Sequence, residues 1–171
     1  MPVNLGKYSY IATGTNEYFN PQVRVGNFSS IADKVTFCGA INHAWVGNKK
    51  LVAVYPFTHA FPGVPVLESY SRGEIIIGND VWIGSEAWIM DGVKIGDGVV
   101  IGARAVVTKD VPPYAVMVGN PGRISHYRFT PEQIEKLLKI KWWNWEDSVI
   151  KERVVDFQDI DLFLEKWGKG L

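Results

Sequence analysis

Four side chains of the sequence are the first candidates for chemistry: His43, His59, His126 and the single cysteine, Cys38. A neutral imidazole with a pKa near ~6.5 accepts a proton at neutral pH, so each histidine is a candidate general base. Three neutral imidazoles that meet at one point also bind zinc. The thiol of Cys38 is a candidate nucleophile, but one cysteine forms neither an intramolecular disulfide nor a cysteine-rich zinc site. Which role applies depends on the elements that hold these residues.

Composition and charge exclude several classes of function. The length of 171 residues fits one domain, or one domain with an appendage, and a composition of 47% hydrophobic and 21% charged residues is that of an ordinary globular protein. Lys and Arg number 18 and Asp and Glu number 18, which argues against binding to duplex nucleic acid and against electrostatic attachment to membranes. No apolar run reaches the ~18 residues of a membrane span, and the N-terminus lacks the pattern of a secretion signal. We therefore expect a cytoplasmic protein with no nucleic-acid or membrane partner.

An aliphatic or aromatic residue recurs every six positions over much of the chain, usually followed by a small residue. The positions are Leu5, Ile11, Val25, Ile31, Phe37, Ile77, Ile83, Ile89, Ile95, Ile101 and Val107. Hydrophobic residues recur every 3.6 positions in an amphipathic helix and every second position in a strand, so neither a long helix nor a long strand accounts for a repeat of six. A sandwich of glycine-rich hairpins would space its turns at ~8–12 residues instead. The period predicts short strands in stacked coils, with one aliphatic side chain per strand in a shared core and glycine easing the turns.

Residues 42–74 interrupt the repeat, because the step from Phe37 to Ile77 is not a multiple of six. The segment contains proline, glycine, aromatic residues and two of the histidines. A smaller slip of two positions lies between Ile11 and Val25. Long irregular segments inside compact domains are often functional, so we expect a loop that carries part of a site.

The C-terminal part of the chain predicts helices. Thr130, Pro131 and Gln133 form the pattern of a capping box with proline in the first turn. We expect a repeat domain at residues 1–128 that includes the loop, and a helical cap at residues 129–171 that covers an open end of the repeat.

The hexads and three further stretches resemble a known family. The hexads are similar to those of the left-handed parallel β-helix acyltransferases. The stretches "INH…YPF", "IIIGNDVWIG" and "RFTPEQIEKLLKIKWWNW" together resemble the xenobiotic acetyltransferase subfamily, which contains the class B chloramphenicol and streptogramin acetyltransferases and related sugar O-acetyltransferases. The resemblance covers nearly the whole chain. It implies an all-β solenoid, a left-handed parallel β-helix with three hexads per coil, an extruded loop and a C-terminal α-helical cap.

The resemblance implies an acetyl-CoA-dependent acetyltransferase that uses no metal. It makes His43, preceded by Asn42, the catalytic general base, and the acceptor's own hydroxyl the nucleophile. Cys38 then occupies the small position of a hexad, which is typical of a packed residue. Zinc carbonic anhydrases share the fold but place two ligand histidines five residues apart, unlike the spacing here. His59 is expected near the acceptor pocket and His126 near the coenzyme.

The resemblance also implies binding residues. Those for coenzyme A are Trp82, Ser85, Ala103, Arg104, Thr108, Lys109 and Arg123. An indole offers a flat apolar wall to pantetheine, and cationic side chains face phosphates. Those for the acceptor are Asn42, Tyr55, Phe57 and Tyr18. The active assembly is expected to be a homotrimer with active sites between subunits, and the partner a small-molecule acceptor.

The acceptor stays open at this point. The segment AWVGNKKLVAV, between His43 and Tyr55, differs from the corresponding segment of the antibiotic-modifying members. A hydroxyl of a sugar in a surface-polysaccharide pathway is the first choice. The alternatives are an antibiotic hydroxyl, the amine of a nucleotide-linked amino sugar, and a solenoid scaffold without catalysis.

Overall fold

The computed structural model describes residues 3–18, 21–39, 45–46, 49–50, 52–55, 57–64 and 71–170. For residues 18, 45–46 and 49–50 it describes the backbone only. Asn42 and His43 lie outside the described residues.

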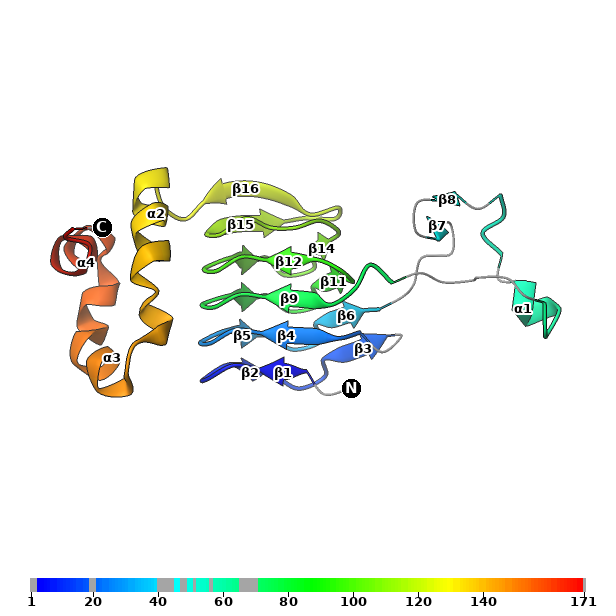
Figure 1. Ribbon diagram of the computed structural model, residues 1–171, viewed down its shortest axis with the longest axis horizontal. Coiled ribbons are helices and arrows are strands. Elements are labelled where there is room, and N and C mark those ends of the chain that lie inside the picture. Colours follow the sequence, from blue (N-terminus) through cyan, green and yellow to red (C-terminus); the bar gives the residue numbers. More distant parts are fainter. Residues whose placement is uncertain are drawn as a thin grey trace.

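Fourteen of the described strands form three sheets, which the chain visits in turn as it winds (Figure 1). The first sheet contains β1 (Asn4–Leu5), β4 (Val23–Val25), β9 (Ile75–Ile77) and β12 (Lys94–Ile95). The second contains β2 (Tyr10–Ile11), β5 (Ser30–Ile31), β10 (Trp82–Ile83), β13 (Val100–Ile101), β15 (Ala115–Val118) and β16 (Arg123–Tyr127). The third contains β3 (Asn16–Tyr18), β6 (Thr36–Cys38), β11 (Trp88–Met90) and β14 (Val106–Val107). All strand pairs in these sheets are parallel except β15 with β16.

The register of the strands confirms the predicted period. Ile83 pairs with Ile101 and Ile89 pairs with Val107, so one regular coil takes three hexads. Each of these four side chains is fully buried. A parallel strand places alternate side chains on opposite faces, so the residue before each of them points outward. The coils therefore have an aliphatic interior and an outer face of different chemistry.

The first coil departs from the ideal repeat. Ile11 pairs with Ile31, so this coil is slightly longer than three hexads, and the predicted slip lies within it. Glu17 pairs with Phe37, so a carboxylate stands where the other coils have an aliphatic or aromatic side chain. Leu5 keeps 38% of its surface exposed. The N-terminal end of the stack is consequently less buried than the middle.

The glycines that follow the inward aliphatic residues serve a purpose other than the one expected. Gly26, Gly78 and Gly96 do not adopt positive φ angles. A Cβ atom at Gly26 would lie 2.7 Å from the backbone of Gly78, and one at Gly78 would lie 2.9 Å from the backbone of Gly96. Glycine is required here because adjacent coils approach too closely for a side chain. The left-handed turns occur two positions later, for example at Phe28 and Asp80, with φ of 58° and 54°.

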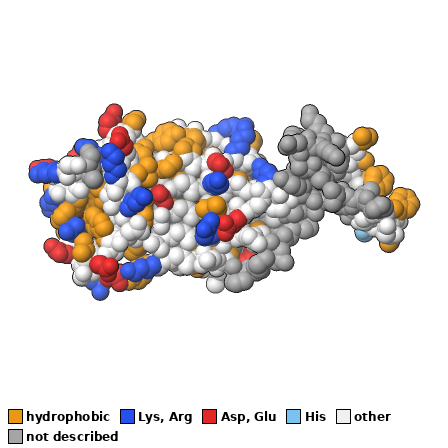
Figure 2. Space-filling view, in the orientation of Figure 1, with side chains coloured by type: hydrophobic (Ala, Val, Ile, Leu, Met, Phe, Trp, Pro, Cys, Tyr) orange, Lys and Arg blue, Asp and Glu red, His pale blue; other side chains and the backbone are white. Residues whose placement is uncertain are grey.

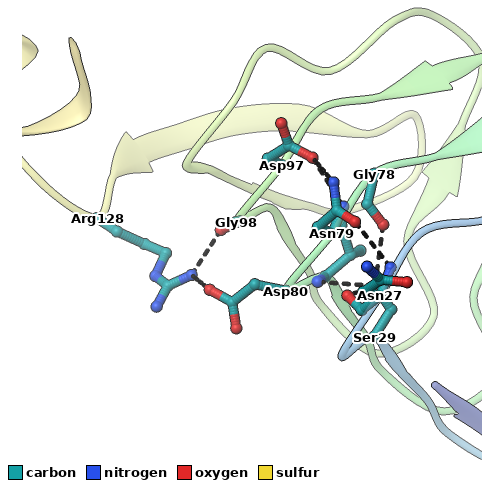
Figure 3. A network of polar contacts seen from close by, with 9 residues as sticks. Asn27, Ser29, Gly78, Asn79, Asp80, Asp97, Gly98 and Arg128 are labelled. Carbon is teal, nitrogen blue, oxygen red and sulfur yellow. Dashed lines mark hydrogen bonds and ion pairs between the residues drawn. The ribbon is translucent and has the colours of Figure 1, made fainter. Parts of the chain in front are cut away.

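A ladder of side chains links the coils at the corner between the first and second sheets, called here the first corner (Figure 3). The side-chain oxygen of Asn27 accepts from the backbone N–H of Lys7, that of Asn79 from Asn27, and that of Asp97 from Asn79. The distances are 2.7–2.8 Å. The buried Ser29 hydroxyl accepts from Val81 N–H and donates to the carbonyl of Gly78, at 3.1 and 3.0 Å. These bonds satisfy backbone groups that the sharp turn removes from the sheet ladders.

The interruption of the repeat leaves from the corner between the third sheet and the first sheet of the next coil, called the third corner. Phe37 pairs with Ile89, so the coil between them is far longer than the regular coil from Ile89 to Val107. The described parts of the insertion contain β7 (Trp45–Val46), β8 (Lys49–Lys50) and α1 (Phe57–Ala60), which lie outside the stack of coils in Figure 1. Parallel pairing resumes in register on either side of it, at β6 and β9.

The C-terminal helices are α2 (Pro131–Ile140), α3 (Asp147–Arg153) and α4 (Ile160–Trp167), with 3₁₀ turns at Trp142–Asn144 and Val154–Gln158. The predicted capping box is present, since Thr130 and Gln133 exchange hydrogen bonds at the start of α2.

None of these helices is long and apolar enough to cross a bilayer, and the same is true of α1, the remaining helix in the described ranges.

The position of the helices differs from the expected cap. They run along the side of the stack, against the first corner, instead of covering its end (Figure 1). Phe28 of the second coil lies 5.0 Å from the ring of Trp142, and Tyr114 of the last coil lies 5.5 Å from Phe129. The physical reason is that the left-handed turn residues project outward at this corner and several are aromatic. Their column gives the helices an apolar surface to pack on.

Aromatic stacking continues into the helices. Trp142 and Phe163 each lie 4.9 Å from Phe157, measured between ring centroids. The guanidinium of Arg153 lies 3.6 Å from the ring centroid of Trp167, which is a close cation–π contact. The helices and the first corner therefore share a second hydrophobic core, separate from the interior of the coils.

The first coil is joined to α3 by an ion pair, and we predict that this contact makes the stability depend on pH. Hydrogen bonds from Lys7 and Tyr8, both at 2.5 Å, hold the pKa of Asp147 below its ordinary value. A carboxyl whose pKa is lower in the folded state stabilises that state above its unfolded pKa of ~3.9, and this contribution is lost as the pH falls through the folded value. Asp147→Asn should therefore unfold at lower urea concentration than the wild type at pH 7, and the gap should narrow as the pH falls below about 4.

Urea titrations at several pH values measure this gap. Glu165→Gln, at an exposed carboxyl of α4, is the matched control and should show no comparable gap at pH 7. A gap for Asp147→Asn that stays constant from pH 7 to pH 3 would contradict the prediction.

Candidate active site

The corner between the second and third sheets, called the second corner, carries three of the residues expected to bind the coenzyme. Ser85, Ala103 and Arg104 lie in its tight turns on consecutive coils. The Ser85 hydroxyl donates to the Asp33 carboxylate at 2.6 Å. The Arg104 side chain is 78% exposed and its Nε atom lies 2.9 Å from the carboxylate of Glu86. The hydrogen bond from Arg104 holds the pKa of Glu86 below its ordinary value, so Glu86 is an anion at neutral pH.

Two exposed indoles flank the second corner. Trp82 is 55% exposed on the second sheet and Trp88 is 42% exposed on the third. Each precedes an inward isoleucine, Ile83 or Ile89, and therefore points outward from its strand. Trp82 was expected from the sequence, whereas Trp88 was not. The signal was present, because "WI" occurs at the same place in two successive hexads.

A shallow groove of about 760 Å³ follows the outer face of the third sheet beside this corner. Its walls come from successive coils and combine an indole, two amides, one hydroxyl and charged groups. The lining residues are Asn16, Lys34, Thr36, Glu86, Trp88, Arg104, Val106 and Asn120. A groove that runs across the coils has the elongated form that a long, flexible ligand requires.

Thr108 and Lys109 lie at the third corner, on the opposite edge of the third sheet from Ser85. Arg123 begins β16 at the C-terminal end of the stack, where its guanidinium donates to the carbonyl of Gly122 at 2.9 Å. The predicted coenzyme residues thus surround the second and third sheets and do not form one cluster within a single chain.

The third corner also fastens the returning end of the inserted segment. The carboxylate of Asp91, which is 4% exposed, accepts the backbone N–H of Arg72 and lies 3.5 Å from its Nε atom. The same guanidinium donates to the carbonyl of Thr108 at 3.2 Å. At the outgoing end, Cys38 pairs with Met90, the neighbour of Asp91. Both ends of the insertion are therefore held to one turn of the next coil.

Cys38 does not have the properties of a nucleophile. It is 1% exposed, and burial, followed by the nearby charge of Asp91, raises the pKa of its thiol. A thiol with a raised pKa is protonated at neutral pH and weakly nucleophilic. The packed position expected from the repeat is confirmed.

The remaining expected site residues lie on or near the insertion. Tyr55 and Phe57 are 50% and 41% exposed, with ring centroids 5.6 Å apart, and Phe61 continues this row at 6.4 Å from Phe57. Apolar side chains gather at this outer tip of the molecule in Figure 2. Tyr18 ends β3 at the third corner.

The two described histidines lie far from each other in the chain: His59 is exposed in α1, and His126 is exposed in β16 beside Ser125. Among the residues for which positions are given, no three His, Cys, Asp or Glu side chains come together as a metal site would require. Asn42 and His43 are outside the described ranges, so their roles stay predictions.

Comparison with known proteins identifies the family. Residues 74–109, which form most of two regular coils, match the family model described as bacterial transferase hexapeptide (six repeats). A probable macrolide acetyltransferase of Lysinibacillus sphaericus is 40% identical over 140 residues, which cover 78% of this chain and 76% of that protein. The chain belongs to the hexapeptide-repeat acetyltransferases.

Other relatives support the same family. A chloramphenicol acetyltransferase of Morganella morganii is 38% identical, with 87% of this chain and 79% of the relative covered. A hexapeptide-repeat acetyltransferase of Vibrio cholerae, solved also in complex with acetyl-CoA, has a TM-score of 0.60 and 26% identity. That comparison covers 75% of this chain and 64% of the Vibrio chain, so the present chain spans just under two thirds of that protein. Likeness to these structures implies the left-handed winding of the coils that the resemblance predicted.

The residues of this hexapeptide acetyltransferase fit acetyl-CoA, the acetyl donor of the family; solved relatives hold acetyl-CoA or coenzyme A. Trp82 and Trp88 offer exposed apolar faces beside the second corner. The guanidinium of Arg104 lies at the groove, is largely open to solvent and suits a phosphate. The exposed indoles therefore suit the pantetheine arm of the coenzyme, and the guanidinium suits its phosphate-bearing end.

Proposed function

We propose that the chain transfers the acetyl group of acetyl-CoA to a hydroxyl of a small hydrophilic acceptor, a sugar, with His43 as general base. The observation that carries this proposal is the insertion at the third corner. It makes one coil far longer than the others, yet Phe37 and Ile89 pair as Ile89 and Val107 do, so the coils do not need it for their packing. The unchanged register on both sides, and the buried anchor at Asp91, are what a catalytic loop on a rigid scaffold requires.

Each group has a defined part in this reaction. Acetyl-CoA supplies the acetyl thioester. The acceptor hydroxyl oxygen bonds to the acetyl carbon while its proton passes to the neutral imidazole of His43. The carbon–sulfur bond breaks, and the proton held by His43 leaves with the coenzyme thiol. The enzyme forms no covalent bond, which agrees with the buried, protonated thiol of Cys38.

We propose the following roles for the binding residues. Trp82 lines the pantetheine path, the Ser85 hydroxyl and the Ala103 backbone bond its amides, and the cationic side chains face phosphates. The set for coenzyme A is Trp82, Ser85, Ala103, Arg104, Thr108, Lys109 and Arg123. The set for the acceptor is Asn42, Tyr55, Phe57 and Tyr18, since aromatic faces stack against the C–H faces of sugar rings.

Two kinds of relative support different acceptors. A polysialic-acid-specific acetyltransferase (27% identity, TM-score 0.57, covering 74% of this chain) and a galactoside acetyltransferase (28%, 0.53, 75%) act on sugars, as their names state. The macrolide and chloramphenicol acetyltransferases, at 40% and 38% identity, favour an antibiotic hydroxyl as the second candidate. The chain's own segment between His43 and Tyr55 is the part that decides between these acceptors.

We also propose that the working enzyme is a homotrimer with its active sites between subunits. In one chain, the expected coenzyme residues lie around two faces of the stack and do not meet. In a trimer, the third corner of one subunit would lie next to the second corner of its neighbour, so that the two parts of the set come together. Light scattering should give three times the chain mass of 19.2 kDa at assay concentrations. A particle of 19.2 kDa that turns over acetyl-CoA would contradict the trimer.

A thiol-release assay with acetyl-CoA tests the function. The acceptor panel contains free sugars, nucleotide-linked amino sugars, chloramphenicol and a streptogramin. We expect turnover with a sugar, and a loss of about 10²- to 10⁴-fold in His43→Ala, because the variant lacks the base that takes the acceptor proton.

Glu165→Gln, at an exposed carboxylate of the C-terminal helices that pack against the first corner, is the control and should keep the wild-type rate. Turnover confined to an antibiotic would replace the sugar as acceptor, and turnover confined to an amine would replace O-acetylation. Full activity in His43→Ala would contradict the role of His43. No turnover and no binding of acetyl-CoA by calorimetry would leave a scaffold instead of an enzyme.

A further inference from the structure

The returning end of the insertion, residues 71–74, packs its backbone directly on a turn of the next coil. The N–H of Gly92 donates to the carbonyl of Gly73 at 3.0 Å, and the hydroxyl of Ser71 accepts the N–H of Gly73 at 3.1 Å. A Cβ atom at Gly92 would lie 2.5 Å from the Cβ atom of Arg72, and Gly92 has a φ of 69°. Only glycine permits both this approach and this turn, so Arg72 is held at a fixed place on the third corner.

The side chain of Arg72 joins two successive coils. Its Nε atom lies 3.5 Å from the carboxylate of Asp91, and another guanidinium nitrogen donates to the carbonyl of Thr108 at 3.2 Å. Thr108 directly follows Val107, which pairs with Ile89, so Thr108 lies one coil beyond the turn that contains Asp91. A guanidinium is a rigid fork of donors, and this shape suits two acceptors at different positions.

The turn after β14, which receives this bond, contains two of the proposed coenzyme residues, Thr108 and Lys109. Its far side is fixed by the coils themselves, because the carboxylate of Asp110 accepts the N–H of Lys94 at 2.8 Å. Its near side is fixed by Arg72, which belongs to the insertion and not to a hexad. The position of Thr108 therefore depends on a side chain from outside the repeat.

A second arginine secures the same end of the insertion in a different way. Arg24 of β4 donates to the carboxylate of Glu74 at 3.0 Å. This ion pair fastens residues 71–74 to the first sheet, whereas Arg72 fastens them to the turn at Thr108. The side chains of Arg24 and Arg72 are similarly exposed, at 56% and 44%. The two arginines thus separate attachment of the insertion from contact with the proposed coenzyme turn.

We propose that Arg72 is a positioning residue for acetyl-CoA, through which the insertion holds Thr108 and Lys109 in the place where they bind the coenzyme. This role of Arg72 rests on the proposed function, in which that turn contacts acetyl-CoA. Because coupling between two sites is reciprocal, bound acetyl-CoA also strengthens the attachment of residues 71–74. The segment that carries the proposed acceptor residues is thereby coupled to the occupancy of the coenzyme site.

Calorimetry and steady-state kinetics with Arg72→Met test this role, since methionine keeps an unbranched side chain and removes every donor. We expect Kd and KM for acetyl-CoA to rise about five- to tenfold, the range set by one hydrogen bond. The value of kcat at saturating acetyl-CoA should stay within about twofold, because the lost contact serves ground state and transition state equally. Arg24→Met is the matched control and should keep the wild-type Kd, because Arg24 secures the insertion to β4 instead of to the turn at Thr108.

Hydrogen exchange followed by mass spectrometry gives a readout that needs no turnover. Acetyl-CoA should slow exchange in peptides that contain residues 71–74, both in the wild type and in Arg24→Met. The same peptides of Arg72→Met should exchange at one rate with and without acetyl-CoA. An arginine that served only to anchor the insertion would not make this exchange respond to the coenzyme.

An unchanged Kd in Arg72→Met, beside normal turnover in the wild type, would overturn the role of Arg72 and leave the acetyl-transfer proposal standing. A lower kcat with unchanged KM for acetyl-CoA would overturn it as well. Wild-type protein that neither binds acetyl-CoA nor turns it over would overturn both proposals.

The variant Arg72→Met leaves the buried carboxylate of Asp91 without its cation, which can prevent folding. In that case Asp91→Asn is compared with the double variant Asp91→Asn/Arg72→Met. The asparagine side-chain oxygen can still accept the N–H of residue 72, so this pair isolates the bond to Thr108. A weaker affinity for acetyl-CoA in the double variant would support the role of Arg72, and equal affinities would contradict it.

Discussion

The close approach of successive coils is the constraint on which the rest of the structure depends. A side chain at Gly26 or Gly78 would meet the backbone of the next coil at less than 3 Å. The coils therefore stack in a fixed register. Side chains at equivalent positions of successive coils form columns, and all side chains of one column point either into the core or out of it. Inward columns become the aliphatic core, and outward columns become the surfaces that bind. Interruptions and appendages are tolerated only at corners, because a corner is the part of the coil that can change length without moving the sheets.

Within that constraint, each of the three corners carries a different part of the molecule. The first bears the helices, held by outward aromatic residues such as Phe28 and by the ion pair of Lys7 with Asp147. The second stays open beside the exposed indoles and the groove on the third sheet. At the third corner the inserted segment leaves the stack, and contacts between Asp91 and Arg72 hold its returning end. A rigid stack thus holds the groove on the third sheet and the anchor of the inserted segment at fixed positions.

The sequence predicted the coils because their period is strict, from Ile77 to Val107, and it predicted the start of α2 because capping is local. It did not predict where the helices pack, since that depends on which turn residues project from a corner. It attributed the glycines to turn conformation, whereas their role is room between coils, a property of neighbours one full coil away in the sequence. Among site residues it missed Trp88, although the repeat marks it as outward, and the anchor at Asp91, because only folding brings that carboxylate to Arg72.

The most direct test of this account is to remove the insertion. Deleting residues 40–73 restores a step of six between Phe37 and Ile77, and Asp91→Asn in the same variant avoids a buried charge that has lost Arg72. We predict that the variant keeps a β-rich circular dichroism spectrum and cooperative unfolding but releases no thiol from acetyl-CoA with any acceptor that the wild type uses. A variant that fails to fold would show that the stack depends on the insertion, and one that retains wild-type turnover would show that catalysis lies elsewhere.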